Sequence, residues 1–282
     1  MSSPRVVHVT DTALMVAAAR AIETARADAI VRDPLAERLA GLRGMALAGT
    51  MTSPEWMGLG VGLRCREIDD MLLEAIAAED IRTVVLLGAG LDTRPWRLAL
   101  PPALRWIEVD FADMLDYKDK LLAGEPPRCR RERIATDLTD PKQRQAVFAA
   151  AGPEPGLMIT EGLLLYLPAA TTQALATESV RLSGIRHWLL DIAASSLMRN
   201  AHQGKLEDVE KVRAKDRVEG RPILDLAERT GWSIVARSAY AAEGFAIAAA
   251  RGLPVLPDPE PATDDPCGIY RLTHSLHKAM PG

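Results

Sequence analysis

An apolar run that enters a glycine turn decides how this chain folds: TVVLLGAGLDT, from Thr83 to Thr93. Twenty residues after Gly90, a second apolar run, WIEVD, ends in the acid Asp110. A glycine turn after one buried strand and an acid at the end of the next are typical of a nucleoside cofactor lying across two adjacent parallel strands. The sequence therefore predicts a cofactor site at the carboxyl ends of these strands.

The sequence around this stretch alternates between strand-like and helix-like segments. Strands are predicted at 83–88, 105–109, 132–136, 157–161, 187–193, 232–238 and 268–274, and helices between them at 112–123, 141–151, 169–183 and 222–230. This alternation predicts a doubly wound α/β fold with a mostly parallel seven-stranded sheet. The last two strands are joined by a long segment in which we expect no regular helix. We expect these two strands to pair antiparallel at the sheet edge.

The sequence predicts two parts within one structural unit. Residues 1–80 read as an N-terminal helical cap, although the glycine-rich segment 41–60 reads as loop with short helical pieces before a helix that begins near Arg64. Residues 81–282 form the predicted cofactor-binding domain. The charged segment 195–221 after the fifth strand is too long for a turn, which predicts a lid insertion.

Composition excludes several classes of protein. The 282 residues carry a net charge of −4 and no broad basic face, which argues against nucleic-acid partners. No apolar run approaches the roughly 18 residues of a membrane span, and we expect no signal peptide. Three distant cysteines, Cys65, Cys129 and Cys267, suggest neither disulfides nor a metal site. We therefore expect a cytoplasmic protein with reduced thiols.

The glycine turn also narrows the choice of cofactor. A dinucleotide fingerprint needs a third glycine where Thr93 stands, and Asp92 would place a negative charge near a pyrophosphate. S-adenosyl-L-methionine has a ribose but no phosphate. For that cofactor, Gly88 and Gly90 would let the backbone approach the methionyl part, and Asp110 would accept hydrogen bonds from the ribose. An NAD-dependent oxidoreductase is the alternative, disfavoured also by the absence of a Tyr-x-x-x-Lys pair.

These residues resemble the leucine carboxyl methyltransferase family, and especially its bacterial branch of small-molecule, polyketide-tailoring O-methyltransferases. The resemblance rests on VLLGAGLDTR at 85–94, EVD at 108–110, ATDL at 135–138 and ITEGLLLYL at 159–167, and runs from about residue 10 to 275. It implies a class I methyltransferase, Rossmann-like fold with S-adenosyl-L-methionine as cofactor.

The resemblance implies roles for the nucleoside end of the site. Gly88 would line the methionyl portion and Asp110 would hold the ribose. Asp137 and Leu138 would frame the adenine, with the aspartate accepting from its exocyclic amine. From its position alone, Asp137 could instead cap the helix that begins near Pro141.

The resemblance also implies roles at the amino-acid end. Arg64 would clamp the methionine carboxylate, for which a guanidinium fork is well suited, and Arg20 is the nearest match to a second cationic group. Glu161 would lie near the methionyl amine or the sulfonium. From their positions alone, Arg64 could pair with Glu67 or Asp69 on the helix surface, and Glu161 could be part of an ordinary turn.

Methyl transfer from a sulfonium depends on alignment of the reactants and exclusion of water. A carboxylate acceptor needs no base, whereas a hydroxyl benefits from one. His202, in the predicted lid, is the candidate base, although it could be an exposed histidine on a charged segment. Tyr166 could line the acceptor pocket or pack in the core.

The function predicted from the sequence is methylation of a carboxylate or hydroxyl of a small molecule, a secondary metabolite, by an O-methyltransferase. A protein that binds S-adenosyl-L-methionine without catalysis is a further alternative. We expect a small-molecule partner and neither nucleic acid nor membrane. The sequence fixes neither the acceptor nor the oligomeric state.

Overall fold

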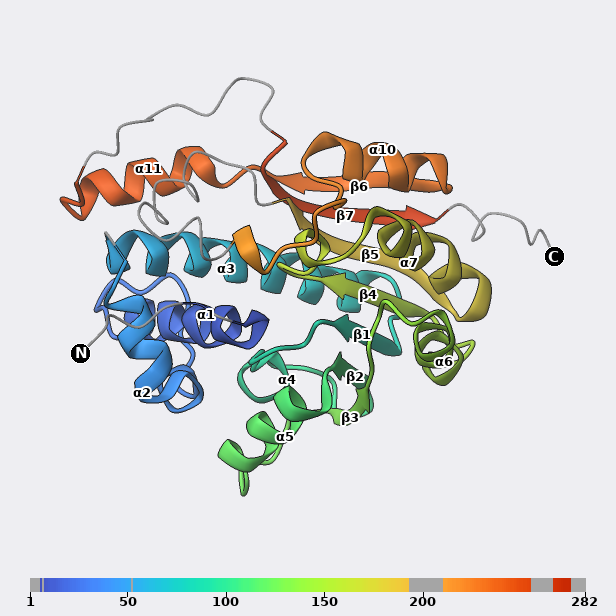
Figure 1. Cartoon of the computed structure of the whole chain (residues 1–282), viewed down its shortest axis with the longest axis horizontal. Helices are drawn as coiled ribbons and strands as arrows, with labels where there is room; N and C mark the ends of the chain where they lie inside the picture. The colour runs from blue at the N-terminus through green and yellow to red at the C-terminus, as the bar shows by residue number, and fades with distance from the viewer. Residues whose placement is uncertain (1–5, 7, 52, 193–209, 255–265, 275–282) are drawn as a thin grey trace.

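The computed structural model describes residues 6, 8–51, 53–192, 210–254 and 266–274. Its centre is a seven-stranded sheet in the order β3-β2-β1-β4-β5-β7-β6 (Figure 1). The strands are β1 (Thr83–Leu87), β2 (Arg105–Asp110), β3 (Arg130–Ala135), β4 (Gly156–Thr160), β5 (Ile185–Ile192), β6 (Trp232–Ser238) and β7 (Gly268–His274). The first five strands are parallel, and β7 pairs antiparallel with both β5 and β6. The predicted mostly parallel sheet and the antiparallel pairing of the last two strands are confirmed.

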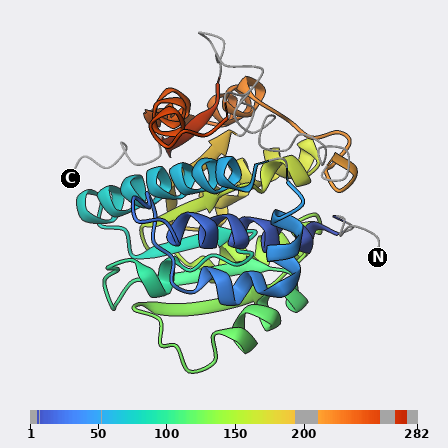
Figure 2. The same ribbon diagram turned by 90° about the vertical axis from the view of Figure 1, so that its left-hand side faces the viewer.

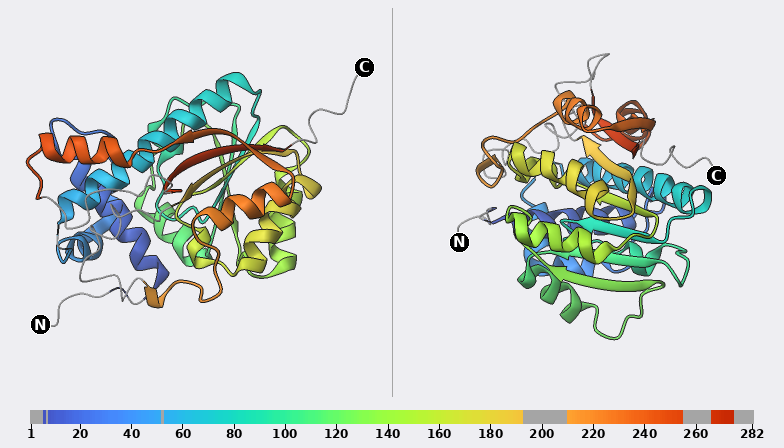
Figure 3. Two further views of the ribbon diagram at one scale, coloured as in Figure 1. Left: turned by 90° about the horizontal axis from the view of Figure 1, so that it is seen from above. Right: turned by 90° about the vertical axis from the view of Figure 1, so that its right-hand side faces the viewer.

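Helices cover both faces of this sheet. They are α1 (Val9–Thr24), α2 (Ala36–Ala48), α3 (Pro54–Ala78), α4 (Arg94–Arg97), α5 (Ala112–Leu121), α6 (Pro141–Ala151), the short η1 (Leu164–Tyr166), α7 (Ala169–Leu182), α10 (Arg221–Arg229) and α11 (Ala241–Ala250). Val84 and Leu86 of β1 pack with α1, α2 and α3, which Figure 2 shows in front of the sheet. Val85 and Leu87 pack with α6, α7 and α10 on the opposite face (Figure 3). A strand buried on both faces is expected to be apolar, and β1 is buried at all five positions and apolar at every position after Thr83.

The loop predicted over 41–60 is wrong, because α3 begins at Pro54 rather than near Arg64. Glycine is common in loops, but the glycines of α3 lie within a helix where it packs against α1. A Cβ added at Gly58 would lie 3.3 Å from the carbonyl oxygen of Ala19 in α1. The glycines therefore let α3 approach α1 closely, and the apolar core formed there outweighs their low helix propensity.

The segment between the last two strands also contains a helix that we did not expect. α11 has the sequence AAEGFAIAAA, and alanine has the highest intrinsic helix propensity. Phe245 packs edge-on against Trp56 of α3, with ring centroids 5.7 Å apart. Alanine-rich composition and this contact with α3 together explain the helix.

Most of the predicted lid, residues 195–209, lies outside the described residues. The described part of this segment, residues 210–221, contacts the residues that follow β4. The Ala214 amide donates to the Leu165 carbonyl at 3.3 Å, and the Ala169 amide donates to the Asp216 carbonyl at 3.1 Å. None of the helices in the described ranges has the length and apolar character that crossing a membrane requires.

We retain, as a proposal, the division into a helical cap over 1–80 and a sheet domain over 81–282. The two parts share one apolar core, which contains residues of α1, α2 and α3 together with β1, β2, β4 and β5. They would therefore fold as a single structural unit.

Gly44→Ala is expected to destabilise the fold by about 1 to 3 kcal/mol, as overpacking does. A Cβ at Gly44 would lie 2.7 Å from the Leu14 carbonyl oxygen, so the contact between α1 and α2 would have to open. Urea denaturation would measure the loss. Gly49→Ala is the matched control because the nearest atom to its added Cβ is 3.4 Å away. Equal stability of the two variants would contradict this account of the packing.

Candidate functional site

A cavity of about 630 Å³ lies where the ends of β1, β2 and β4 meet α1 and α3. Nine of the ten predicted site residues line it: Arg20, Arg64, Gly88, Gly90, Asp110, Asp137, Leu138, Glu161 and Tyr166. The tenth, His202, lies outside the described residues. The fold thus brings together side chains that come from six separate segments of the sequence.

The glycine turn after β1 forms the floor of the cavity. Gly88 and Gly90 have φ angles of +66° and +44°, a conformation that favours glycine. A Cβ added at Gly88 would lie 2.8 Å from a methyl carbon of Leu163, so a larger residue would require that side chain to move in addition to straining the backbone. The Gly90 amide donates to Oδ2 of Asp110 at 2.6 Å and ties the turn to β2.

Asp110 ends β2 and faces the same cavity. Its Oδ1 accepts from the Phe111 amide at 2.7 Å, and its Oδ2 accepts from Gly90. Burial raises the pKa of Asp110, and these two backbone hydrogen bonds oppose the rise. Because an ionised carboxylate has about four acceptor positions, each oxygen keeps capacity for a ligand.

Asp137 follows β3 and is held by its own turn. Its Oδ1 accepts from the amide and hydroxyl of Thr139 at 2.9 and 2.7 Å, and Oδ2 has no hydrogen bond to the described residues. The alternative that Asp137 caps the following helix is wrong, because Asp140 caps α6 and accepts from the Lys142 amide at 2.8 Å. Leu138 is buried beside Asp137.

Glu161 lies immediately after β4 between two arginines. Its Oε1 is 2.9 Å from Nε of Arg64, and its Oε2 is 2.8 Å from Nη1 of Arg94. Burial opposes ionisation, but the charges of Arg94 and Arg64 lower the pKa of Glu161 to about 2. The carboxylate is therefore ionised at neutral pH, and the site is more than an ordinary strand-end turn.

Arg64 has a second acidic partner that the sequence did not suggest. Its Nη1 is 3.5 Å from Oδ2 of Asp191, the acid near the end of β5. The other oxygen of Asp191 accepts from the Gly162 amide at 2.7 Å. The predicted alternative of a local pair with Glu67 or Asp69 is wrong for Arg64.

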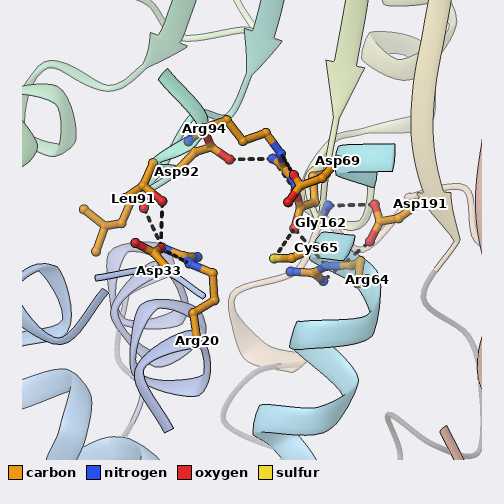
Figure 4. Close-up of polar contacts among 12 residues, drawn as sticks. Arg20, Asp33, Arg64, Cys65, Asp69, Leu91, Asp92, Arg94, Gly162 and Asp191 are labelled. Carbon is orange, nitrogen blue, oxygen red and sulfur yellow. Dashed lines mark hydrogen bonds and ion pairs between the residues drawn. The ribbon is translucent and has the colours of Figure 1, made fainter. Parts of the chain in front are cut away.

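Arg94 is the member of the buried charge network that sequence reasoning missed most clearly. Its side chain is 1% exposed and contacts carboxylates of three segments: Asp69 in α3, Asp92 in the glycine turn, and Glu161 (Figure 4). Arg94 is the last residue of the motif VLLGAGLDTR, on which the family resemblance rests. The sequence therefore drew attention to Arg94 but did not predict which carboxylates it would contact. Asp191 is an acid near the end of a strand, the same signal that identified Asp110.

Arg20 of α1 meets the glycine turn from the opposite side. Its Nε contacts Oδ2 of Asp33 at 2.8 Å, and its Nη2 donates to the Leu91 carbonyl at 2.6 Å. The Thr93 hydroxyl donates to the same oxygen of Asp33 at 2.7 Å. Figure 4 shows Arg20 extending from α1 and Arg64 from α3 toward the same group of buried charged side chains.

Tyr166 lies at the end of η1 and is half-buried in the cavity wall rather than packed in the core. Burial raises the pKa of its hydroxyl, and a hydrogen bond with Thr12 of α1 opposes this rise. This contact joins α1 to the segment that follows β4.

Comparison with known proteins identifies relatives of the chain. A family model described as "Leucine carboxyl methyltransferase" matches residues 13–180. A protein of Frankia alni, named as a candidate S-adenosyl-L-methionine-dependent methyltransferase, is 39% identical over 58% of this chain and 61% of its own length. A Mycobacterium tuberculosis protein of the same description is 34% identical over 84% of this chain and 81% of its own. The chain spans 59–66% of the length of the first six relatives.

Among solved structures, an O-methyltransferase family protein from Burkholderia thailandensis is similar with a TM-score of 0.47. It is 13% identical, and the match covers 78% of this chain and 60% of that one. This likeness assigns no role to any residue.

Arg94→Met is expected to destabilise the protein by about 3 to 5 kcal/mol, because three carboxylates would lose a buried partner. Urea denaturation at neutral pH would measure the change. Arg82→Met is the matched control, since the one ion pair that Arg82 forms with the described residues is an exposed one with Asp80, 2.7 Å away, and such pairs contribute at most about 1 kcal/mol. Similar losses in both variants would show that the Arg94 network does not stabilise the fold.

Proposed function

The chain belongs to the leucine carboxyl methyltransferase family, and from this premise we propose that it is an S-adenosyl-L-methionine-dependent O-methyltransferase. The proposed acceptor is a carboxylate or hydroxyl of a small molecule, a secondary metabolite such as a polyketide. One observation carries the proposal: Asp110, Asp137, Glu161 and its partner Arg64 line a single cavity of about 630 Å³. That volume is within the roughly 300–1,000 Å³ usual for cofactor sites.

The residues at the nucleoside end fit the proposed cofactor. Asp110 has acceptor capacity left for two ribose hydroxyls, and Oδ2 of Asp137 is available for an exocyclic amine. Leu138 offers an apolar surface to a base. Phe111, which sequence reasoning did not select, is 43% exposed, lines the cavity and offers a second such surface.

The residues at the other end fit an amino acid. Glu161 is an ionised acceptor for the methionyl ammonium. Arg20 and Arg64 both line the cavity and can donate to the carboxylate. Ammonium and carboxylate groups bound at adjacent, oppositely charged side chains would fix the orientation of the whole molecule.

S-adenosyl-L-methionine, when bound, supplies an electrophilic methyl group on a sulfonium. The chain's own residues would bind and orient the donor, align the acceptor and exclude water. Val9, Val16 and Leu165 contribute an apolar wall on the side of α1 and η1, which suits an acceptor with an apolar body. His202 remains the proposed base for a hydroxyl acceptor.

The NAD-dependent alternative has less support. A pyrophosphate requires backbone N–H groups at the glycine turn, and Asp110 already accepts from the Gly90 amide. The negative charge of Asp92 in the same turn is compensated by its ion pair with Arg94, so the engaged Gly90 amide is the remaining conflict. A phosphate-free cofactor avoids that conflict.

Asp110→Asn is expected to weaken S-adenosyl-L-methionine binding by about 2 to 3 kcal/mol, because hydrogen bonds to a charged acceptor would be lost. Isothermal titration calorimetry would measure the affinity. Asp113→Asn, an exposed acid three residues later, should leave it unchanged. Equal affinity in the wild type and Asp110→Asn would remove Asp110 from the ribose site.

His202→Ala is expected to reduce turnover about 100-fold or more for a hydroxyl acceptor, because a general base contributes that factor. The same variant should be fully active with a carboxylate acceptor, which is already ionised. Formation of S-adenosylhomocysteine with a panel of small hydroxy compounds and acids would test both cases. Full activity of His202→Ala with a hydroxyl acceptor would exclude His202 as the base.

A further inference from the structure

We propose that the buried charge cluster behind the cavity selects a cationic sulfonium donor over its neutral thioether product, and that Asp191 supplies the negative charge responsible. This inference rests on the proposed function and names a specificity-determining residue that does not itself line the cavity. It would let the site release S-adenosylhomocysteine in exchange for fresh donor.

The first step is the charge of the cluster. It contains four guanidinium groups and five carboxylates, and none of these side chains is more than 13% exposed. The guanidinium groups belong to Arg20, Arg64, Arg94 and Arg97, and the carboxylates to Asp33, Asp69, Asp92, Glu161 and Asp191. With all nine groups ionised, the cluster has one negative charge in excess within the described residues. Burial raises the pKa of Asp191 and the charge of Arg64 opposes this rise, so the ligands are compared at about pH 8.

The second step locates the excess charge. Asp33, Asp69 and Glu161 each contact an arginine within 2.9 Å. The closest arginine nitrogen to Asp191 is Nη1 of Arg64, at 3.5 Å, and Arg64 is also paired with Glu161. Oδ2 of Asp191 is buried and has no hydrogen-bond partner within the described residues. Asp191 is therefore the least compensated carboxylate of the cluster.

Neighbouring groups do not cancel this charge. Cys65 lies beside Glu161, but burial raises the pKa of its thiol to about 12, so it is neutral. At the cavity mouth, Arg213 and Arg217 pair with Glu210 and Glu219, which leaves that group balanced.

The third step is the charge of the ligand. The ammonium and carboxylate of the methionyl part cancel, so the sulfonium gives the donor a net charge of +1. The product lacks that charge. In a buried site, where the effective dielectric constant is far below that of water, an excess carboxylate attracts a cation over several ångströms. The cluster should therefore bind donor and product with different affinities although the two have nearly the same shape.

The experiment compares two stable ligands by calorimetry at about pH 8, with S-adenosylhomocysteine as the neutral one. The cationic one is sinefungin, whose ammonium group replaces the sulfonium. We expect the wild type to bind sinefungin about tenfold more tightly, a preference that Asp191→Asn should reduce at least about threefold. Asp191→Glu, which keeps the charge, should retain most of the preference.

Glu178→Gln is the matched control, because Glu178 forms a buried pair with Arg144 between α6 and α7 and does not line the cavity. It removes one buried charge and should leave the ligand preference unchanged. A merely structural effect of Asp191→Asn would weaken both ligands by the same factor and leave their ratio constant. That constant ratio would overturn the inference.

The wild type alone also tests the inference if Asp191→Asn does not fold. Equal affinity of the wild type for the two ligands would contradict the inferred preference for the cationic ligand without contradicting the proposed function. Failure of the wild type to bind either ligand would instead overturn the proposed function, and the inference with it.

Discussion

The ion pairs of Arg94 hold together the parts of the molecule that form the site. This buried guanidinium contacts Asp69 of α3, Asp92 of the glycine turn and Glu161 after β4. Removing a charge from water is costly and is offset only when its hydrogen-bonding groups find charged partners. Arg94 therefore links α3, the glycine turn and the end of β4 through three ion pairs, and only its Nη2 has no hydrogen-bond partner within the described residues.

The proposed site has two ends, one formed by the sheet and the other by the N-terminal helices. The sheet contributes the carboxylates at the nucleoside end, Asp110 at the end of β2 and Asp137 after β3. The helices contribute the guanidinium groups at the amino-acid end, Arg20 from α1 and Arg64 from α3. Glu161 belongs to the sheet but is held by α3 through Arg64. The donor proposed here would thus contact both parts, and its amino-acid end depends on correct docking of the helices.

What the sequence predicts and what it misses have a common physical reason. The strands and the positions of Gly88 and Asp110 are readable because they depend on short-range patterns, an apolar run followed by a glycine or an acid. Ion pairs between distant segments leave no such pattern. Arg64 and Glu161 are separated by 97 positions, so local spacing offered only Glu67 and Asp69 as partners for Arg64, and this pairing was kept as the alternative to a role at the cofactor. The early start of α3 was missed because glycine at a helix contact reads the same as glycine in a loop.

The side of the cavity that we propose for the acceptor depends on backbone hydrogen bonds and apolar contacts rather than on buried ion pairs. Its wall combines α1, η1 and the segment over 210–219, joined by the contact of Thr12 with Tyr166 and by backbone hydrogen bonds of Ala214 and Asp216. Backbone bonds place few demands on side chains, and Val9, Val16 and Leu165 would contact the proposed acceptor only through apolar surface. Substitutions in this wall can therefore change the acceptor without disturbing the buried charges that would hold the donor.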